Sequence, residues 1–411
     1  MKKVKIKRES YEIVSEEFAE YLEYGIADER INFQQTKAFG DLQEVLGHKV
    51  FYFVLDNSGF QAAILVTLTK IRFGYLAEAY GNPYFSEDLA DNQYLIRSLK
   101  SFLKKRGVLK LVIHSNQMIE KYDDNWETIG KFNQDLTDFY AQIGLSESQL
   151  TDFEKGFHFN YSKNLADFEF LSQLEKSYKR KGLQTVKKAR KLGIDIVEAT
   201  FDELDDFKKV VDEAGERRDF QTRDLTYYQS VYKAYGNDVK FIFAKMNFQE
   251  ALEANQLEIE EIKVAIDKAQ VKNKMKSLDT LYQRLARADK LQLEFEKFVE
   301  KYGNKSVILS AAQFFIMPCE MTYMFSGMYD EFRDFSAQFL IQDEMLKFAF
   351  YEEIDTFHFL GVNAKDESDQ GVLKFKQNFG GYIWESSGNY ELIVKPILYK
   401  VTEILKTITK R

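Results

Sequence analysis

The order of predicted elements in the first third of the chain is repeated in its second half. The first series is a hairpin, a strand with a loop, an amphipathic helix and a buried strand, over 51–70, 75–85, 92–107 and 108–114. The same series recurs over 239–246, 306–316, 321–332, 336–353 and 354–362. Upstream of each series, "INFQQTKAFGDLQEVLG" (31–47) resembles "DFQTRDLTYYQSVYKAYG" (219–236). The repeat predicts two copies of one unit, and therefore an α/β (α+β) fold.

The two copies differ at the turn of the hairpin. Four residues, 56–59, form this turn in the first copy, whereas 247–305 occupies its place in the second. The insert contains no proline, and apolar residues recur in it at heptad spacing, which favours an antiparallel coiled-coil arm. These residues are Leu252, Ile259, Ile262, Ile266 and Ala269, followed by Leu278, Leu281, Leu285, Ala288, Phe295 and Val299.

The repeat and the insert define the expected domains. We expect a first lobe over 1–165, a second lobe over 166–246 and 306–411, and a coiled-coil arm over 247–305. With 411 residues and 45% hydrophobic content, the chain is long enough to bury a core in each lobe. A lone cysteine, Cys319, fits a reducing compartment, and no apolar run is long enough to span a bilayer. A cytoplasmic protein is expected, and peripheral contact with the inner face of the membrane stays open.

A basic stretch interrupts this acidic chain, whose net charge is −8. "KSYKRKGLQTVKKARKLG" (176–193) contains eight Lys or Arg and no acid. Such a cluster is typical of phosphate-backbone binding, although a charge run is as often only a solvated helix face. The residues predicted to contact RNA are Lys179, Arg180, Lys181, Lys187, Lys188, Arg190 and Lys191.

Several kinds of catalytic chemistry have no support in the sequence. There is no GxxxxGK[ST] loop, no dinucleotide fingerprint and no GxSxG elbow. The histidines lie far apart in the sequence and without metal-ligand spacing around Cys319, so a structural role is expected for each; they are His48, His114, His158 and His358. No metal or cofactor is expected. Catalysis by positioning and electrostatics remains.

Three stretches together resemble the Fem-type (FemABX) peptidoglycan aminoacyltransferases. They are "ERRDFQTRDLTYYQSVY" (216–232), "YMFSGMY" (323–329) and "GVLKFKQNFGGYI" (371–383). Among the branch-forming enzymes of this family, the resemblance is strongest to the MurN type. It implies two tandem GCN5-related acetyltransferase-like lobes with a coiled-coil arm. It also implies transfer of an amino acid from aminoacyl-tRNA to an amine on the stem peptide of a peptidoglycan precursor, either lipid II or UDP-MurNAc-peptide.

The resemblance implies a set of substrate-binding residues. The phosphate-contacting arginine of the family falls on Arg223, and a substrate-contacting tyrosine falls on Tyr227. A salt bridge from Arg223 to Asp224 or Asp219 is the alternative. The family's threonine two residues before the arginine is Gln221 here, and its aromatic residue corresponds to Tyr323 or Phe325. Lys37 lies near the place of the family's N-terminal phosphate-binding lysine, at the repeat position equivalent to Arg223.

The resemblance also implies that Lys376, with Phe375 before it, is the catalytic residue. Its ammonium group could stabilise the oxyanion formed when an amine attacks the aminoacyl ester, or neutralise the 3′-terminal phosphate of the tRNA. A lysine whose stem lies on apolar surface while its charge reaches water is the alternative. Asp219 and the departing ribose hydroxyl are both candidates for the proton acceptor.

Two other functions are weighed against this interpretation. An acyl-CoA-dependent N-acyltransferase would need a pyrophosphate-binding loop at a helix start, and neither lobe shows one. A non-catalytic tRNA-binding adaptor would use only the basic stretch and the arm. The resemblance to the MurN type favours alanine as the donated amino acid, with serine or glycine as alternatives.

Overall fold

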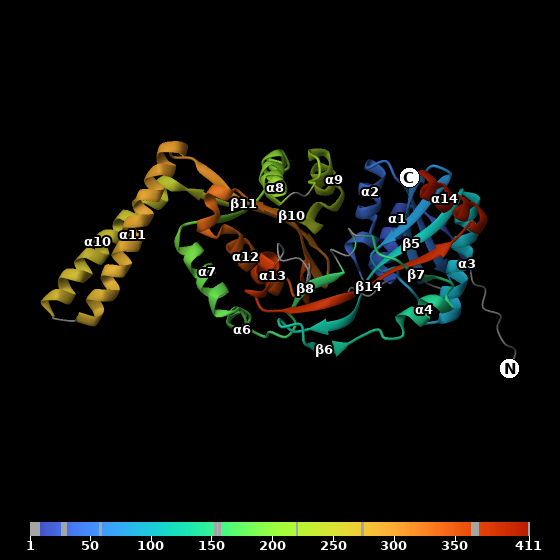
Figure 1. Cartoon of the computed structure of the whole chain (residues 1–411), viewed down its shortest axis with the longest axis horizontal. Coiled ribbons are helices and arrows are strands. Elements are labelled where there is room, and N and C mark those ends of the chain that lie inside the picture. The colour runs from blue at the N-terminus through green and yellow to red at the C-terminus, as the bar shows by residue number, and fades with distance from the viewer. Residues whose placement is uncertain are drawn as a thin grey trace.

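The computed structural model describes residues 9–25, 31–56, 60–151, 154, 158–218, 221–272, 275–362 and 370–409. Its strands join into one twisted sheet that runs through the whole body of the molecule (Figure 1). The strands are β1 (Glu9–Ile13), β2 (Lys49–Asp56), β3 (Phe60–Ile71), β4 (Gly74–Tyr80), β5 (Val108–Tyr122), β6 (Thr128–Lys131), β7 (Ser146–Ser148), β8 (Phe159–Asn164), β9 (Asp195–Glu198), β10 (Val239–Asn247), β11 (Ser306–Ile316), β12 (Glu320–Met328), β13 (Thr356–Gly361) and β14 (Tyr382–Ile393).

Helices cover both faces of this sheet. They are α1 (Ser15–Gly25), α2 (Lys37–Val45), α3 (Leu89–Lys105), α4 (Leu136–Gln142), α6 (Leu171–Lys176), α7 (Arg180–Lys191), α8 (Leu204–Arg218), α9 (Leu225–Tyr235), α10 (Phe248–Val271), α11 (Met275–Tyr302), α12 (Ala337–Tyr351), α13 (Gln370–Gln377) and α14 (Pro396–Thr409). The sequence explains their placement. In α3, for example, the carboxylate of Asp88 caps the first turn by accepting from the backbone of Ala90 at 2.8 Å, and Leu95, Leu99 and Leu103 are buried on one face.

The structure confirms the α/β fold class and the repeat. In each copy a helix, α2 or α9, is followed by three antiparallel strands, β2–β3–β4 or β10–β11–β12. A crossover helix, α3 or α12, then leads to a strand that pairs in parallel with the third one, β5 with β4 and β13 with β12. The two copies are therefore tandem lobes with the same connectivity.

The two lobes are not separate in space, because strands near the C-terminus join them. The first residues of β14 pair with β8 on one edge, and almost the whole length of β14 pairs with β5 of the first lobe on the other edge. β8, which lies within 1–165, pairs with β13 of the second lobe, and α14 packs on β5. The predicted limits 1–165 and 306–411 thus follow the repeat along the chain, whereas the sheet exchanges strands across them.

The insert between β10 and β11 forms the two helices α10 and α11. They lie side by side and extend away from the body (Figure 1). Ile259, Ile262, Ile266 and Ala288 form a small core of their own, against which Leu278, Leu281 and Leu285 pack. These predicted heptad positions face the partner helix, whereas Leu252, Phe295 and Val299 pack into the core of the second lobe.

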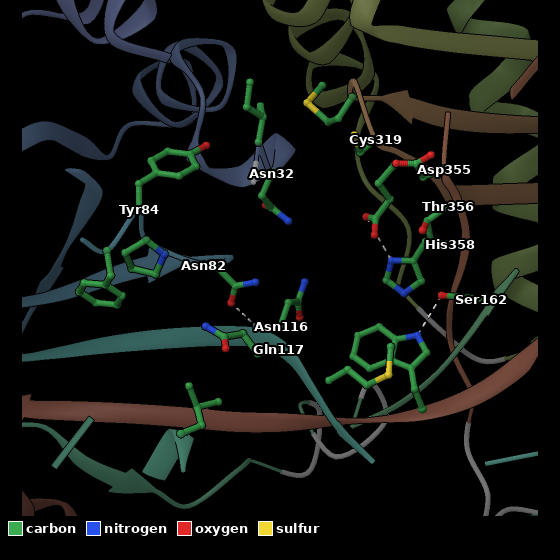
Figure 2. A pocket seen from close by; sticks show the side chains of 18 of the residues that line it. Asn32, Asn82, Tyr84, Asn116, Gln117, Ser162, Cys319, Asp355, Thr356 and His358 are labelled. Atoms are coloured by element: carbon green, nitrogen blue, oxygen red, sulfur yellow. Dashed lines mark hydrogen bonds and ion pairs between the residues drawn. The ribbon is translucent and has the colours of Figure 1, made fainter. Parts of the chain in front are cut away.

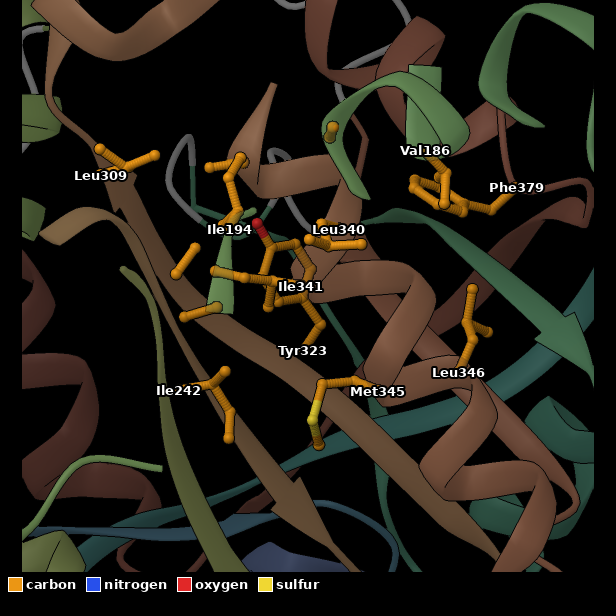
Figure 3. Close-up of a cluster of buried hydrophobic side chains, with 14 of the residues drawn as sticks. Val186, Ile194, Ile242, Leu309, Tyr323, Leu340, Ile341, Met345, Leu346 and Phe379 are labelled. Carbon is orange, nitrogen blue, oxygen red and sulfur yellow. The ribbon is translucent and has the colours of Figure 1, made fainter. Parts of the chain in front are cut away.

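Each face of the sheet has its own core. Figure 3 shows the cluster of the second lobe, in which α12 supplies Leu340, Ile341 and Met345 and α7 supplies Val186. On the opposite face, one cluster combines Phe33 and Phe39 of the first lobe with Tyr228 and Phe315 of the second. This shared core brings α2 and α9 into contact across the lobes.

Candidate functional site

Lys376 is a buried residue of α13. Its side chain is 4% exposed, and its Nζ donates to the carbonyl oxygens of Leu360 at 3.0 Å and Gly361 at 2.6 Å. Burial rules out the solvated lysine considered from the sequence, because the ammonium group bonds to backbone carbonyls instead of water.

The carbonyls that accept hydrogen bonds from Lys376 belong to the part of β13 that no longer pairs with the parallel strand β12. β12 and β13 pair only from Glu320 to Thr322 and from Thr356 to His358, although both strands continue beyond this point. The register of β13 shifts after His358, and Leu360 has a positive φ of 63°. A non-glycine residue rarely adopts this conformation unless the surroundings impose it. Lys376 is therefore held by carbonyls of β13 that lie beyond the residues paired with β12.

The turn after α13 is fixed by a second buried lysine. Lys163 on β8 donates to the Phe379 carbonyl at 2.8 Å, the Gly380 carbonyl at 2.7 Å and the Ser177 hydroxyl at 2.6 Å. Burial lowers the pKa of Lys163 to about 7. The backbone N–H of Lys179, at the start of α7, donates to the Asn378 carbonyl at 3.0 Å. These contacts fix the position of the helix that carries Lys376.

Phe375 lies beside Lys376 and is partly buried. Its ring is 4.9 Å from that of Phe339 on α12 and 5.6 Å from that of Phe379. Phe375 and Phe379 therefore anchor α13 to the core of the second lobe.

Arg223 lies immediately before α9 and is exposed. Its guanidinium lies 5.2 Å from the ring of Tyr227, which in turn lies 6.1 Å from the ring of Phe325 on β12. The carboxylate of Asp224 caps the helix by accepting from the backbone of Tyr227 at 2.8 Å. Within the described part of the chain, no ion pair joins Arg223 to Asp224, and Asp219 lies outside the described residues.

Lys37 begins α2, as Arg223 precedes α9. Its Nζ is 2.6 Å from a carboxylate oxygen of Asp41, and about a third of its side chain is exposed. α2 and α9 pack together, and the Tyr235 hydroxyl at the end of α9 donates to the Phe33 carbonyl just before α2 at 2.9 Å, so Lys37 lies beside the end of α9 and Arg223 at its start. Helix N-termini favour anions.

Tyr323, Phe325 and Gln221 have different surroundings. The hydroxyl of Tyr323 donates to that of Ser326 and accepts from the amide of Gln338 at 2.8 Å. Phe325 faces Tyr227 instead, so the structure joins Phe325 rather than Tyr323 to Arg223. Gln221 is exposed.

The basic stretch forms the exposed face of α7. Gly182, Val186 and Ala189 are buried, whereas the predicted RNA-contacting residues are exposed. Two of them are engaged within the protein: Lys179 pairs with Asp124 at 2.7 Å, and Arg190 pairs with Asp343 at 2.5 Å and with Glu344. Arg180, Lys181, Lys187, Lys188 and Lys191 form no ion pair with another described residue.

A cavity of about 720 Å³ lies between the lobes. Figure 2 shows Asn82, Asn116 and Gln117 of the first lobe on one wall and Asp355 and His358 of the second lobe on the other. None of the residues predicted from the sequence to form the site lines this cavity. Lys376 is linked to it through β13, since His358 lies two residues before Leu360 on the same strand.

The sequence missed the polar pair in this cavity, Glu320 and His358. The His358 Nδ1 lies 3.4 Å from a carboxylate oxygen of Glu320, which also accepts from the Thr322 hydroxyl at 2.9 Å. Burial raises the pKa of Glu320, but the contacts with His358 and Thr322 outweigh it, and the net effect is a lowered pKa. A histidine inside the apolar run "IDTFHFLGV" was the available signal. The described residues, including those of this cavity, contain no group of three or more His, Cys, Asp or Glu arranged to hold a metal ion.

Comparison with known proteins identifies the chain. The family model described as "FemAB family" matches residues 13–407. Aminoacyltransferase FemA of Staphylococcus aureus (strain bovine RF122 / ET3-1) is 26% identical over 404 residues, which cover 92% of this chain and 94% of FemA, and FemA of strain N315 gives the same values. The crystal structure of FemX has a TM-score of 0.75 at 19% identity, covers 96% of this chain and 99% of FemX, and shows the same fold.

The two lobes share this fold, and curated aminoacyltransferases match the chain over nearly its whole length. The protein is therefore an enzyme of the aminoacyltransferase class. The chain belongs to the FemAB family. Its general role is that of a FemAB-family aminoacyltransferase in the synthesis of peptidoglycan bridges. None of the helices within the described ranges is both long and apolar enough to cross a membrane.

Proposed function

We propose that this enzyme transfers alanine from alanyl-tRNA to an amine on the stem peptide of a lipid-linked peptidoglycan precursor. The observation that carries the proposal is the exposed cation at the N-terminus of α9. Arg223 lies immediately before this helix, with its guanidinium 5.2 Å from the ring of Tyr227. An arginine fork at a helix N-terminus suits a diphosphate. A diphosphate links the sugar to its carrier both in lipid II and in UDP-MurNAc-peptide.

The proposed reaction needs little covalent chemistry from the protein, because the aminoacyl ester is already activated. The neutral acceptor amine attacks the ester carbonyl, the C–N bond forms, and the C–O bond to the ribose breaks. Negative charge develops on the carbonyl oxygen during the attack. Lys376, buried against the carbonyls at the end of β13, is the proposed group that stabilises this charge, and its burial strengthens the interaction. Phe375 positions the helix.

The exposed lysines of α7 are the proposed contacts for the tRNA. The start of α7 bonds to the turn that ends α13, so an RNA bound along α7 lies close to the helix that carries Lys376. The acyl-CoA alternative has no corresponding pyrophosphate loop in the sequence, and membership of an aminoacyltransferase family argues against both it and the adaptor function.

A transfer assay tests the proposal. Purified enzyme is incubated with radiolabelled alanyl-, seryl- or glycyl-tRNA, or with labelled acetyl-CoA, and with lipid II or UDP-MurNAc-pentapeptide as the acceptor. We expect label from alanyl-tRNA to appear in lipid II. Label from acetyl-CoA, or no transfer from any aminoacyl-tRNA, would exclude the proposed reaction.

Replacing Arg223 by alanine is expected to weaken acceptor binding. Loss of a charged hydrogen-bonding partner at a diphosphate costs about 1.5–3 kcal/mol, so the KM for the acceptor should rise roughly 10- to 100-fold with little change in kcat. Steady-state kinetics with varied acceptor measures this. Arg217→Ala is the matched control, since Arg217 pairs with Asp330 on the same lobe. An unchanged acceptor KM in Arg223→Ala would contradict the assignment.

The C-terminal helix supports association with the membrane surface. Ile397, Val401 and Ile404 are exposed at i, i+4 and i+7 of α14, with exposed fractions of 84%, 43% and 60%. Lys395 lies immediately before this helix, and Lys400 lies on it. An apolar row with flanking lysines is typical of helices that lie in the surface of an anionic bilayer. This is the compartment in which a lipid-linked acceptor would be found.

Replacing Ile397 and Val401 by glutamate should abolish binding to anionic vesicles. Sedimentation with phosphatidylglycerol vesicles measures the bound fraction, and we expect it to fall at least tenfold without a change in thermal stability, because both side chains are exposed. Replacing the exposed Val264 of the arm by glutamate is the control. Equal sedimentation of the α14 variant and the unmodified enzyme would refute a membrane role for α14.

A further inference from the structure

The cavity between the lobes is acidic and rich in amides. Its lining includes the carboxylates of Glu87, Glu320 and Asp355 and the side-chain amides of Asn82 and Asn116 (Figure 2). No lysine or arginine is among the described residues that line it. The proposed phosphate contacts, Lys37 and Arg223, also lie outside it. The cavity is therefore unsuited to a phosphate and suited to a cation.

His358 on the cavity wall has an unmatched hydrogen-bonding atom. Its side chain is 5% exposed, and its Nδ1 faces Glu320 at 3.4 Å. A carboxylate can only accept, so the tautomer in which Nδ1 donates to Glu320 leaves Nε2 with a lone pair. The Nε2 is buried and finds no hydrogen-bond partner among the described residues. A buried acceptor without a donor is costly, and a ligand that supplies an N–H group would remove this cost.

The first lobe contains an equivalent Glu–His pair, in which both ring nitrogens of the histidine have partners. In the first lobe, His114 lies opposite Tyr80 on the neighbouring parallel strand, and Glu78 lies two residues before Tyr80. In the second lobe, His358 lies opposite Thr322, and Glu320 lies two residues before Thr322. In the first lobe both ring nitrogens are engaged, Nε2 with Glu78 and Nδ1 with Glu154, each at 3.2 Å. The two repeats thus contain equivalent Glu–His pairs. Of these two, only the pair in the second lobe lines the cavity and has a ring nitrogen without a hydrogen-bond partner among the described residues.

We propose that Glu320 and His358 form the binding site for the acceptor's amine, and that His358 Nε2 takes the proton that the amine must lose. The inference rests on the proposed transfer reaction and names the group that activates its nucleophile. The ammonium form first gives one proton to Nε2. The neutral amine then attacks the ester carbonyl, and its second proton leaves with the ribose oxygen as a hydroxyl group.

The position of His358 suits this role. It lies on β13, and the carbonyls of Leu360 and Gly361 that hold Lys376 follow two and three residues later. At about 3.3 Å per residue, the proposed proton acceptor and the proposed oxyanion contact are within about 10 Å along one strand. The titratable groups that line the cavity together with His358 are Glu320 and Cys319, Asp355 immediately before β13, Tyr382 on β14 and Glu87 from the first lobe.

Acetylation of the acceptor tests the amine site without tRNA. Calorimetry compares UDP-MurNAc-pentapeptides that carry a free lysine or alanyl-lysine amine with the same molecules after N-acetylation. We expect acetylation to weaken binding at least tenfold, and Glu320→Gln to reduce this ratio to within twofold. Glu78→Gln, the matched change in the first lobe, should retain the full ratio. Equal binding of free and acetylated acceptors by the unmodified enzyme, or binding of neither, would overturn the inference whatever the variants do.

The pH dependence of transfer tests the proton acceptor. Glutamine at 358 keeps a hydrogen-bond acceptor but takes no proton, so acceptor binding should stay within threefold while transfer at pH 7 falls about 100-fold. In His358→Gln the rate should then rise tenfold per pH unit up to pH 8, because only the amine deprotonated in solution reacts. Transfer close to the unmodified rate at pH 7 would refute the role. If the unmodified enzyme bound amines selectively but transferred nothing from aminoacyl-tRNA, the proposed function would fail and the amine site would stand.

Discussion

Lys376→Met is expected to lower the rate of alanine transfer by about 100- to 1000-fold. Removing a single group that stabilises an oxyanion typically costs about 3–4 kcal/mol of transition-state stabilisation. Methionine retains the length and the apolar character of the stem, so the variant removes the charge beside the carbonyls of Leu360 and Gly361. The rate of a single turnover, with enzyme in excess over alanyl-tRNA, measures the effect on the chemical step.

The same substitution also affects stability, and this effect has to be separated from catalysis. The carbonyls of Leu360 and Gly361 lose a buried donor, which costs about 1–3 kcal/mol of unfolding free energy. Thermal unfolding of the variant should therefore show a lower but cooperative transition. Lys374→Met is the matched control, because Lys374 is exposed on the same helix. A folded Lys376→Met enzyme with near-normal turnover would exclude the catalytic role of Lys376.

Reversing three charges on α7 is expected to have the next largest effect. Lys187, Lys188 and Lys191 are suited to the test because they are exposed, whereas Arg190 is held by Asp343 and Glu344. Changing all three to glutamate removes up to three phosphate contacts and adds repulsion. We expect the affinity for alanyl-tRNA to fall about 10- to 100-fold at 0.1 M salt, and the slope of log K against log salt to decrease by about two to three.

Filter binding over a range of salt concentrations measures both quantities. The control carries the same charge change on the first lobe, at the exposed Lys70, Lys104 and Lys105. Equal loss of affinity in both triple variants would show that general charge, not α7, accounts for binding. Unchanged affinity in the α7 variant would assign the basic stretch to a solvated helix face.

Local patterns in the sequence predicted most of the fold. The 3.6-residue and two-residue periodicities of apolar residues placed α3, α12 and the strands of both repeats, because burial of one face requires those spacings. The heptads of the insert predicted α10 and α11 for the same reason. By contrast, no local pattern predicts the exchange of β8 and β14 between the lobes, because the apolar pattern of a strand does not depend on which half of the sheet it joins.

The candidate site was predicted in part. The equivalence of Lys37 and Arg223 came from aligning the two repeats, and the structure places both residues at the starts of neighbouring helices. The assignments of Lys37, Arg223 and Lys376 to substrate remain proposals. Glu320 and His358 were missed because they lie 38 residues apart in the sequence and neither belongs to a recognisable motif.

The sequence by itself determined the two lobes, the arm and the family, because hydrophobic period, internal repetition and shared motifs are properties of consecutive residues. Only the tertiary structure decided which charged groups are buried and what faces them. It placed Lys376 on the carbonyls of β13, engaged Arg190 within the protein, and left the Nε2 of His358 unmatched beside a cavity. The reason is that burial and hydrogen-bond partners arise from the packing of distant segments, and the same lysine or histidine can be solvated or enclosed depending on that packing.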